Sequence, residues 1–88
     1  MPVDTWRVEL DRTSDVPLYQ QIANLLRADI MKGTYPPGST IPSVKFMEQE
    51  TGCTHVTIRK GIDILEDEGL VIVRPGKGTY VARRDNGQ

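Results

Sequence analysis

The chain has 88 residues, a formal net charge of −1, 38% hydrophobic residues and a single cysteine. This length predicts one small domain with a modest core. No apolar run approaches the ~20 residues of a membrane-spanning helix, and the N-terminus lacks the basic and apolar regions of a signal peptide. Cys53 has no partner for an internal disulfide, which is typical of reduced cytosolic proteins. We therefore expect a cytoplasmic protein with no membrane partner.

The first elements in chain order are a short strand and a helix. Residues 6–10 (Trp-Arg-Val-Glu-Leu) alternate apolar and polar side chains, which predicts a strand with one buried face. Apolar residues then repeat at helical spacing from Leu18 to Ile30, and Gly33 is expected to end this helix. Asp15 is the predicted N-cap, with Pro17 in the first turn.

A turn and two more helices follow. Tyr35–Gly38 contains two prolines and a glycine, which predicts a turn, and Ile41 is expected to contribute one residue of strand pairing. Ser43 is the predicted N-cap of a short helix over Val44–Thr51, which Gly52 ends. The next helix spans 54–68, with Thr54 as N-cap and Gly69 after its end. Two helices joined through a short glycine-containing turn are typical of a helix-turn-helix.

The charges of the 54–68 helix oppose its dipole. Its first half holds polar and basic residues, namely Thr54, His55, Thr57, Arg59 and Lys60. Its second half holds four acids, namely Asp63, Glu66, Asp67 and Glu68. A helix dipole favours the reverse order, by about 0.3–1 kcal/mol per charge. Cations and donors at a helix N-terminus suit phosphates and base edges, so this order favours an external anionic partner over a merely solvated helix.

The C-terminal part predicts a β-hairpin. Leu70–Arg74 and Thr79–Ala82 read as strands, and Pro75–Gly78 as a glycine-rich turn that carries Lys77. The predicted fold is therefore α+β: a winged helix-turn-helix of three helices with a C-terminal β-hairpin wing and a short N-terminal strand. Residues 1–82 form the predicted domain, and 83–88 a polar tail that is expected to be disordered. In this fold the second helix of the motif lies in the major groove, and its acidic end is expected to point away from the phosphates.

An ordered set of motifs resembles the GntR family of bacterial transcriptional regulators. The set comprises Pro17–Ile22, Gly33, Pro37-Gly38, Ile41–Ser43, Gly52, Thr54–Arg59, Leu65–Leu70 and Arg74–Val81. The residues before Pro17 and the junction Pro42–Lys45 are most similar to the YtrA-like and MocR-like branches. Lys45 and His55 stand where many members have arginine, and these departures bear on the operator sequence rather than on DNA binding.

The resemblance implies sequence-specific binding of double-stranded DNA, with repression as the common mode. It also implies a homodimer on a palindromic operator and an effector-binding domain in a C-terminal region, which is expected to be absent from this chain. The DNA-facing residues that it implies, together with Lys60 as a phosphate contact inferred from its place on the helix, are Ser43, Lys45, Thr54, His55, Thr57, Arg59, Lys60, Gly76, Lys77, Gly78 and Thr79.

Structural alternatives remain for several of these residues. Ser43 has a capping role in any reading, Thr57 has the option of bonding within its helix, and turn geometry alone explains Gly76 and Gly78. A protein-protein docking module is the alternative function, because winged helices also serve in docking. An enzyme is rejected, because the sequence has one histidine, one cysteine, no metal-ligand spacing and no phosphate-binding loop motif. No cofactor or metal is expected.

Overall fold

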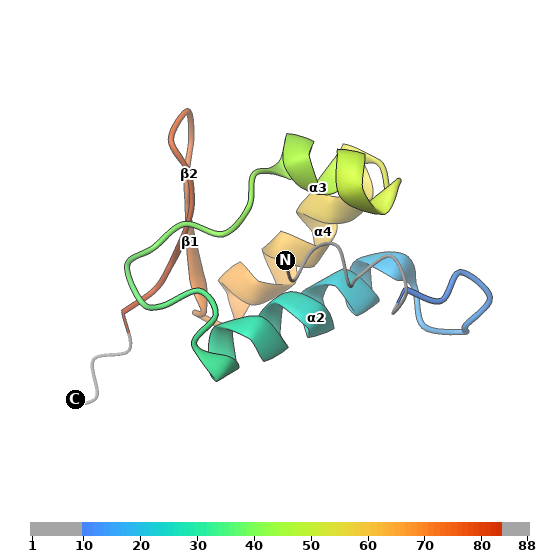
Figure 1. Cartoon of the computed structure of the whole chain (residues 1–88), viewed down its shortest axis with the longest axis horizontal. Coiled ribbons are helices and arrows are strands. Elements are labelled where there is room, and N and C mark those ends of the chain that lie inside the picture. The colour runs from blue at the N-terminus through green and yellow to red at the C-terminus, as the bar shows by residue number, and fades with distance from the viewer. Residues whose placement is uncertain (1–9, 84–88) are drawn as a thin grey trace.

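The computed structural model describes residues 10–83. Their elements in chain order are α2 (Leu18–Lys32), α3 (Val44–Thr51), α4 (His55–Asp67), β1 (Val71–Arg74) and β2 (Gly78–Val81). Helices α2 and α4 pack along one another, α3 lies beside α4, and the β1–β2 hairpin stands at one end of the helices (Figure 1). The predicted order of three helices and a wing is confirmed. Of the predicted N-terminal strand at 6–10 only Leu10 is described, and of the predicted tail at 83–88 only Arg83; the other residues of both lie outside the described residues.

Helix α2 begins differently from the prediction. Its N-cap is Pro17, whose side chain cannot accept a capping bond, so the expectation that Asp15 caps this helix is wrong. The side chain of Gln21 instead holds the preceding loop. Its amide nitrogen donates to the carbonyls of Asp11 and Val16 at 2.9 and 2.8 Å, and its oxygen accepts from the amide of Asp11 at 2.7 Å. Gln21, in the first turn of α2, thus orders the loop before the helix, whereas Asp15 was expected to cap the helix.

The caps of α3 and α4 confirm the predictions. Ser43 Oγ accepts from the amide of Phe46 at 3.1 Å, and Thr54 Oγ1 accepts from the amide of Thr57 at 3.3 Å. Gly69 follows α4 with a φ of 78°, and the amide of Leu70 donates to the carbonyl of Leu65 at 3.0 Å. The amide of Gly69 also donates to the carbonyl of Glu66 at 3.0 Å, so two of the last carbonyls of α4 are satisfied and the chain is placed for β1.

The wing is a two-stranded antiparallel sheet, and a third segment pairs with the outer edge of β2. Val71 pairs with Val81 at its base and Arg74 with Gly78 at its tip. Residues 38–41 run along β2, through an isolated bridge between Thr40 and Tyr80 and through the amide of Ile41, which donates to the carbonyl of Thr79 at 3.0 Å. The bridge falls one residue before the predicted pairing at Ile41. This segment fixes the base of the wing to the connection that leads into α3.

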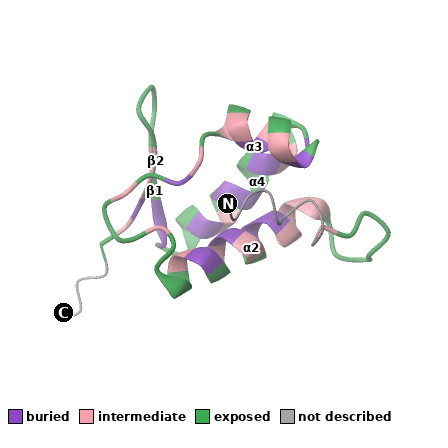
Figure 2. Ribbon diagram, in the orientation of Figure 1, coloured by how far each residue is buried: buried purple, intermediate pink, exposed green. Residues whose placement is uncertain are grey.

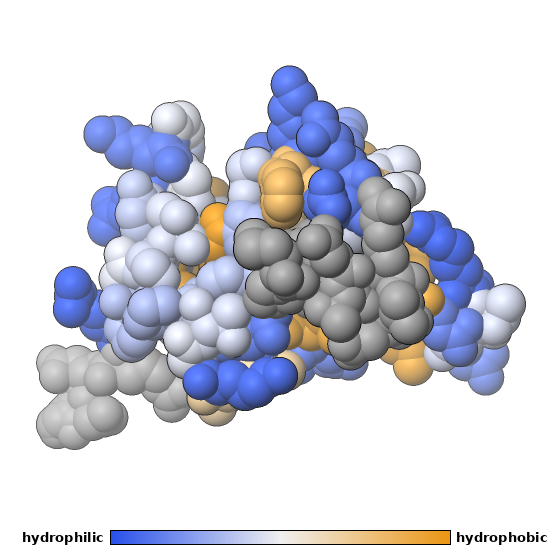
Figure 3. All heavy atoms as spheres, in the orientation of Figure 1, coloured by the Kyte–Doolittle hydropathy of each residue, from blue (hydrophilic) through white to orange (hydrophobic). Residues whose placement is uncertain are grey.

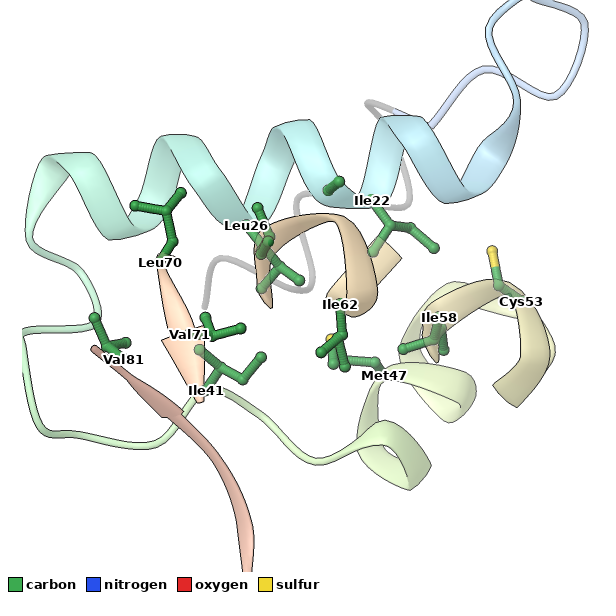
Figure 4. Close-up of a cluster of buried hydrophobic side chains, with 12 residues drawn as sticks. Ile22, Leu26, Ile41, Met47, Cys53, Ile58, Ile62, Leu70, Val71 and Val81 are labelled. Carbon is green, nitrogen blue, oxygen red and sulfur yellow. The ribbon is translucent and has the colours of Figure 1, made fainter. Parts of the chain in front are cut away.

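The core lies between α2, α4 and the base of the wing. Buried residues gather on the facing sides of α2 and α4 and at the start of β1 (Figure 2). The buried apolar set is Ile22, Ala23, Leu26, Ile41, Met47, Cys53, Ile58, Ile62, Leu65, Leu70, Val71 and Val81 (Figure 4). In α4 the buried positions follow a helical stripe, so the opposite side of this helix is left exposed.

Residues 10–83 hold neither a candidate membrane span nor a candidate metal site. No helix there combines the length and apolar character that a bilayer crossing requires. Nor does this part of the chain bring together three His, Cys, Asp or Glu side chains in an arrangement able to hold a metal ion.

Candidate nucleic-acid interface

An open groove separates the wing from the outer side of α4. The connection 40–44 forms part of its wall, the wing residues 73–79 form another, and Arg59, Ile62, Asp63 and Glu66 of α4 also line it. The space-filling view shows a notch between the wing and α3, with hydrophilic residues on both sides (Figure 3). Six of the predicted DNA-facing residues line this groove, namely Ser43, Arg59, Gly76, Lys77, Gly78 and Thr79.

The other five predicted residues lie outside the groove, on α3 and α4. Lys45 is exposed in the first turn of α3, and Thr54, His55 and Thr57 occupy the N-terminal end of α4. Lys60 lies toward α2, with its ammonium 5.3 Å from the centre of the Tyr19 ring, a cation–π contact. The predicted set therefore forms one groove and an adjoining surface along the starts of α3 and α4.

Capping explains part of this set without any ligand. Ser43 and Thr54 each satisfy a first-turn amide. The hydroxyl of Thr54 also donates to that of Thr57 at 3.2 Å, so the alternative that Thr57 bonds within its helix is confirmed. A capping residue still leaves other first-turn amides free, since a helix N-terminus has four unpaired donors. The starts of α3 and α4 thus keep backbone amides that are free to donate hydrogen bonds to an anion.

The wing tip owes its glycines to backbone geometry. Gly76 and Gly78 have φ values of 76° and 129°, which other residues rarely adopt. A Cβ at either position would meet no atom within 4 Å, so the turn and not close packing requires glycine. Between them Lys77 is exposed, and its amide donates to the carbonyl of Arg74 at 2.9 Å. This tight turn presents a cation beyond the end of the sheet.

The groove holds both signs of charge. Within residues 10–83 no acidic side chain is ion-paired with Arg59 or Lys77, whereas His55 Nδ1 lies 3.6 Å from Glu48 Oε2 of α3. Asp63 and Glu66 line the same groove. The acidic end of α4 was expected to point away from the phosphates, but these two residues lie in the groove with Arg59 and Lys77. Helical periodicity explains this, because Asp63 and Glu66 follow Arg59 by one and two turns on the same side of α4.

Sequence reasoning missed two residues of this surface. Arg74 lines the groove, and its guanidinium carbon lies 5.8 Å from the centre of the Tyr80 ring on the outer side of the wing. Its charge and its place beside the glycine turn were the available signal. Val56 is an exposed apolar residue in the first turn of α4. Its place opposite the buried stripe was readable from helical spacing.

Comparison with known proteins decides the family. The family model for bacterial regulatory proteins of the gntR family matches residues 18–81. The chain belongs to the GntR family. This match covers all three helices and the wing of this GntR-family chain, and it confirms the predicted resemblance.

Individual relatives agree with this assignment. The regulator YurK of Bacillus subtilis is 36% identical over 72 residues, which are 82% of this chain and 30% of YurK. The transcriptional repressor YtrA of Bacillus subtilis is 31% identical over 75 residues, 85% of this chain and 58% of YtrA. The structure of the AraR DNA-binding domain in complex with operator ORX1 is 32% identical, with a TM-score of 0.76 over 82% of this chain and 89% of that one.

The curated relatives are much longer than the part of them that this chain matches. This GntR-family chain spans 14% to 31% of the length of the first four curated relatives that it matches. The likeness to AraR confirms the winged-helix fold, because the match covers most of both chains.

Proposed function

We propose that this chain binds double-stranded operator DNA as a transcriptional regulator. The N-terminal half of α4 enters the major groove, and the wing loop at 74–79 approaches the adjacent minor groove. One observation carries the proposal: the groove between α4 and the wing joins Arg59, Lys77 and the capped start of α3 on one exposed surface. The second helix of a helix-turn-helix reads bases from its N-terminal residues, and these are the polar and basic residues of α4.

Each group has a role that its chemistry suits. Arg59 is exposed on α4 and has the forked guanidinium that pairs with guanine O6 and N7. Lys77 is carried by a glycine turn that lets the backbone approach a minor groove. Free amides at the starts of α3 and α4 hold phosphates, beside Ser43 and Thr54. The remaining contacts that we propose come from Lys45, His55, Thr57, Lys60, Gly76, Gly78 and Thr79.

The operator is proposed to be palindromic and to bind two copies of the chain. One recognition helix reads only a few base pairs, so a second copy on a symmetric half-site is needed for a selective site. Repression is the proposed mode of regulation. The name of the relative YtrA as a repressor supports the proposed mode, and the structure of AraR in complex with an operator supports operator DNA as the partner.

A salt series tests DNA binding directly. The affinity for a mixed-sequence duplex is measured at several salt concentrations for the wild type, Arg59→Ala and Lys77→Ala. A protein that neutralises phosphates loses affinity linearly on a log-log plot, with a slope of about −0.9 per phosphate. We expect a slope of several for the wild type, and a slope about one unit shallower for a variant that has lost a phosphate contact.

Lys32→Ala is the matched control, because Lys32 is an exposed cation at the C-terminal end of α2 and does not line the groove. It should keep the wild-type slope. A variant that keeps the slope but no longer discriminates between sequences would mark a base-reading residue. A folded wild-type chain that binds no duplex at any salt concentration would contradict the proposal and favour the docking module.

A further inference from the structure

Val56 is an apolar side chain on the part of α4 that is otherwise polar or charged. It occupies the first turn of the helix, between His55 and Thr57, and 54% of its surface is exposed. In an α-helix each residue turns by about 100°, so Val56 points about 200° away from Ile58, which lies in the buried stripe. The side chain of Val56 therefore projects directly away from the core.

The same face carries the residues that our proposed function assigns to DNA. Arg59 and Lys60 lie one turn after Val56. Viewed along the helix axis, one points to each side of Val56 on the exposed face. Arg59 faces the groove beside the wing, and Lys60 faces Tyr19 of α2. Val56 thus lies at the middle of the exposed face, at the end of α4 that enters the major groove in the proposed complex. In the proposed complex a side chain in this place faces the floor of that groove, between its two flanking cations.

The chemistry of valine restricts which base edges its side chain recognises in the major groove. Its side chain has two methyl groups and neither donates nor accepts hydrogen bonds. The major-groove edges of adenine, guanine and cytosine present hydrogen-bonding groups, which valine leaves unpaired. Thymine alone also presents an apolar group, its 5-methyl. We propose that Val56 packs against the 5-methyl group of a thymine in each operator half-site and makes thymine the preferred base there. This inference rests on the proposed function and adds one base to it.

Removal of the thymine methyl group without any change in base pairing tests the inference. A consensus site is first selected from a random duplex library with the whole chain. Each thymine of the consensus is then replaced by uracil, one at a time, which removes only the 5-methyl group. We expect one thymine per half-site at which uracil weakens binding by the wild type by about fourfold, the effect of one buried methyl group.

The variant Val56→Ser should lose this discrimination. It should bind the thymine and uracil forms of that position equally, while it keeps the salt dependence of the wild type. Val16→Ala is the matched control, because Val16 is also exposed, at 42%, but lies in the loop before α2. That variant should keep the fourfold preference. Circular dichroism melting shows whether each variant is folded, and the uracil scan of the wild type needs no variant.

Two failures are distinguishable. A wild-type chain that selects no sequence overturns the proposed function and this inference with it. A chain that selects a sequence in which every thymine tolerates uracil overturns the role of Val56 alone. A uracil effect that survives in Val56→Ser likewise assigns the methyl contact to another residue.

Discussion

Arg27 and Glu68 join the two long helices through a bidentate ion pair. Arg27 Nε donates to Glu68 Oε1 at 2.8 Å and Nη2 donates to Oε2 at 2.5 Å, while Nη1 donates to Asn24 at 2.7 Å. Arg27 lies in α2 and Glu68 caps the C-terminal end of α4. Planar, two-pronged pairs of this kind fix orientation more firmly than single contacts. The pair holds α4 in place at the end opposite to its proposed DNA-binding residues.

This pair predicts a pH-dependent part of the stability. The hydrogen bonds from Arg27 lower the pKa of Glu68 below its usual value of 4.5. A carboxyl group with a lowered pKa in the folded state stabilises the fold above its unfolded pKa, and this stabilisation is lost as pH falls through the folded pKa. Both side chains are partly exposed, so we expect Glu68→Gln to lower the free energy of unfolding by about 0.2–1 kcal/mol at pH 7.

Urea denaturation at pH 7 and in the acid range below 4.5 measures this effect. The difference between wild type and Glu68→Gln should shrink as the pH falls. Asp67→Asn, an exposed neighbour at the end of α4, is the control and should leave the stability nearly unchanged. A constant difference across the whole pH range would show that Glu68 stabilises the fold by something other than its charge.

Gly61 allows α2 and α4 to approach closely. A Cβ at this position would lie 2.9 Å from the carbonyl oxygen of Tyr19 and 3.1 Å from Ile22 Cγ2. The carbonyl belongs to the backbone of α2, so relief requires that the helices move apart. We expect Gly61→Ala to destabilise the fold by about 1–3 kcal/mol, as overpacked cores do, although alanine is the better helix former. Thermal unfolding tests this, with Asp63→Ala as an exposed control in the same helix. An equal or raised melting temperature for Gly61→Ala would contradict the close approach.

Ser43 and Gly61 differ in how well the sequence alone predicts their structural roles. Ser43 was predictable because an N-cap is local: a hydroxyl, a helix start and a free amide lie within four residues. Gly61 gave no such signal, because its reason is the backbone of α2, which lies far away in the chain. The binding surface divides in the same way. The helix starts and the wing turn were readable from the sequence, and helical spacing places Asp63 and Glu66 on the same side of α4 as Arg59. That this side forms the wall of a groove depends on how α4 packs against the wing.

Tyr35 carries a buried hydroxyl without a hydrogen-bond partner among the described residues. Burial, with a smaller contribution from the charge of Asp29, raises the pKa of Tyr35 to about 12. An acid with a raised folded pKa destabilises the fold as pH rises above its unfolded value of 10.0. We expect Tyr35→Phe to reduce the loss of stability between pH 10 and 12 and to cost little at pH 7, since no bond is removed. Denaturation of the wild type and of Tyr35→Phe across this range measures the difference.

Asp63 and Glu66 are expected to weaken non-specific DNA binding. Both carboxylates line the groove that also holds Arg59 and Lys77, so they repel phosphates that approach it. The double variant Asp63→Asn with Glu66→Gln should bind a mixed-sequence duplex more tightly at low salt. The gain should fade near 0.1 M salt and above, where charges are screened beyond about 10 Å.

Asp67→Asn removes one acidic charge from the same helix and is the control for this effect. Asp67 does not line the groove, so its loss should change the affinity less than the loss of either groove acid. If Asp67→Asn gave half the gain in binding free energy of the double variant, net charge and not the placement of the acids would explain that gain.

Ser43 combines a structural cap with a proposed phosphate contact, and two substitutions separate these roles. Ser43→Ala removes the acceptor for the amide of Phe46, which should cost about 0.5–2 kcal/mol of stability. Ser43→Asp restores an acceptor and suits the helix dipole, so it should retain the wild-type stability. Its negative charge would repel a phosphate at the start of α3. We therefore expect Ser43→Asp to unfold like the wild type but to bind duplex DNA at least tenfold more weakly, as the loss of about 1.4 kcal/mol implies. Thermal melts and anisotropy titrations measure the two quantities on the same samples. Wild-type affinity for Ser43→Asp would show that no phosphate lies at the start of α3, and would restrict Ser43 to its cap.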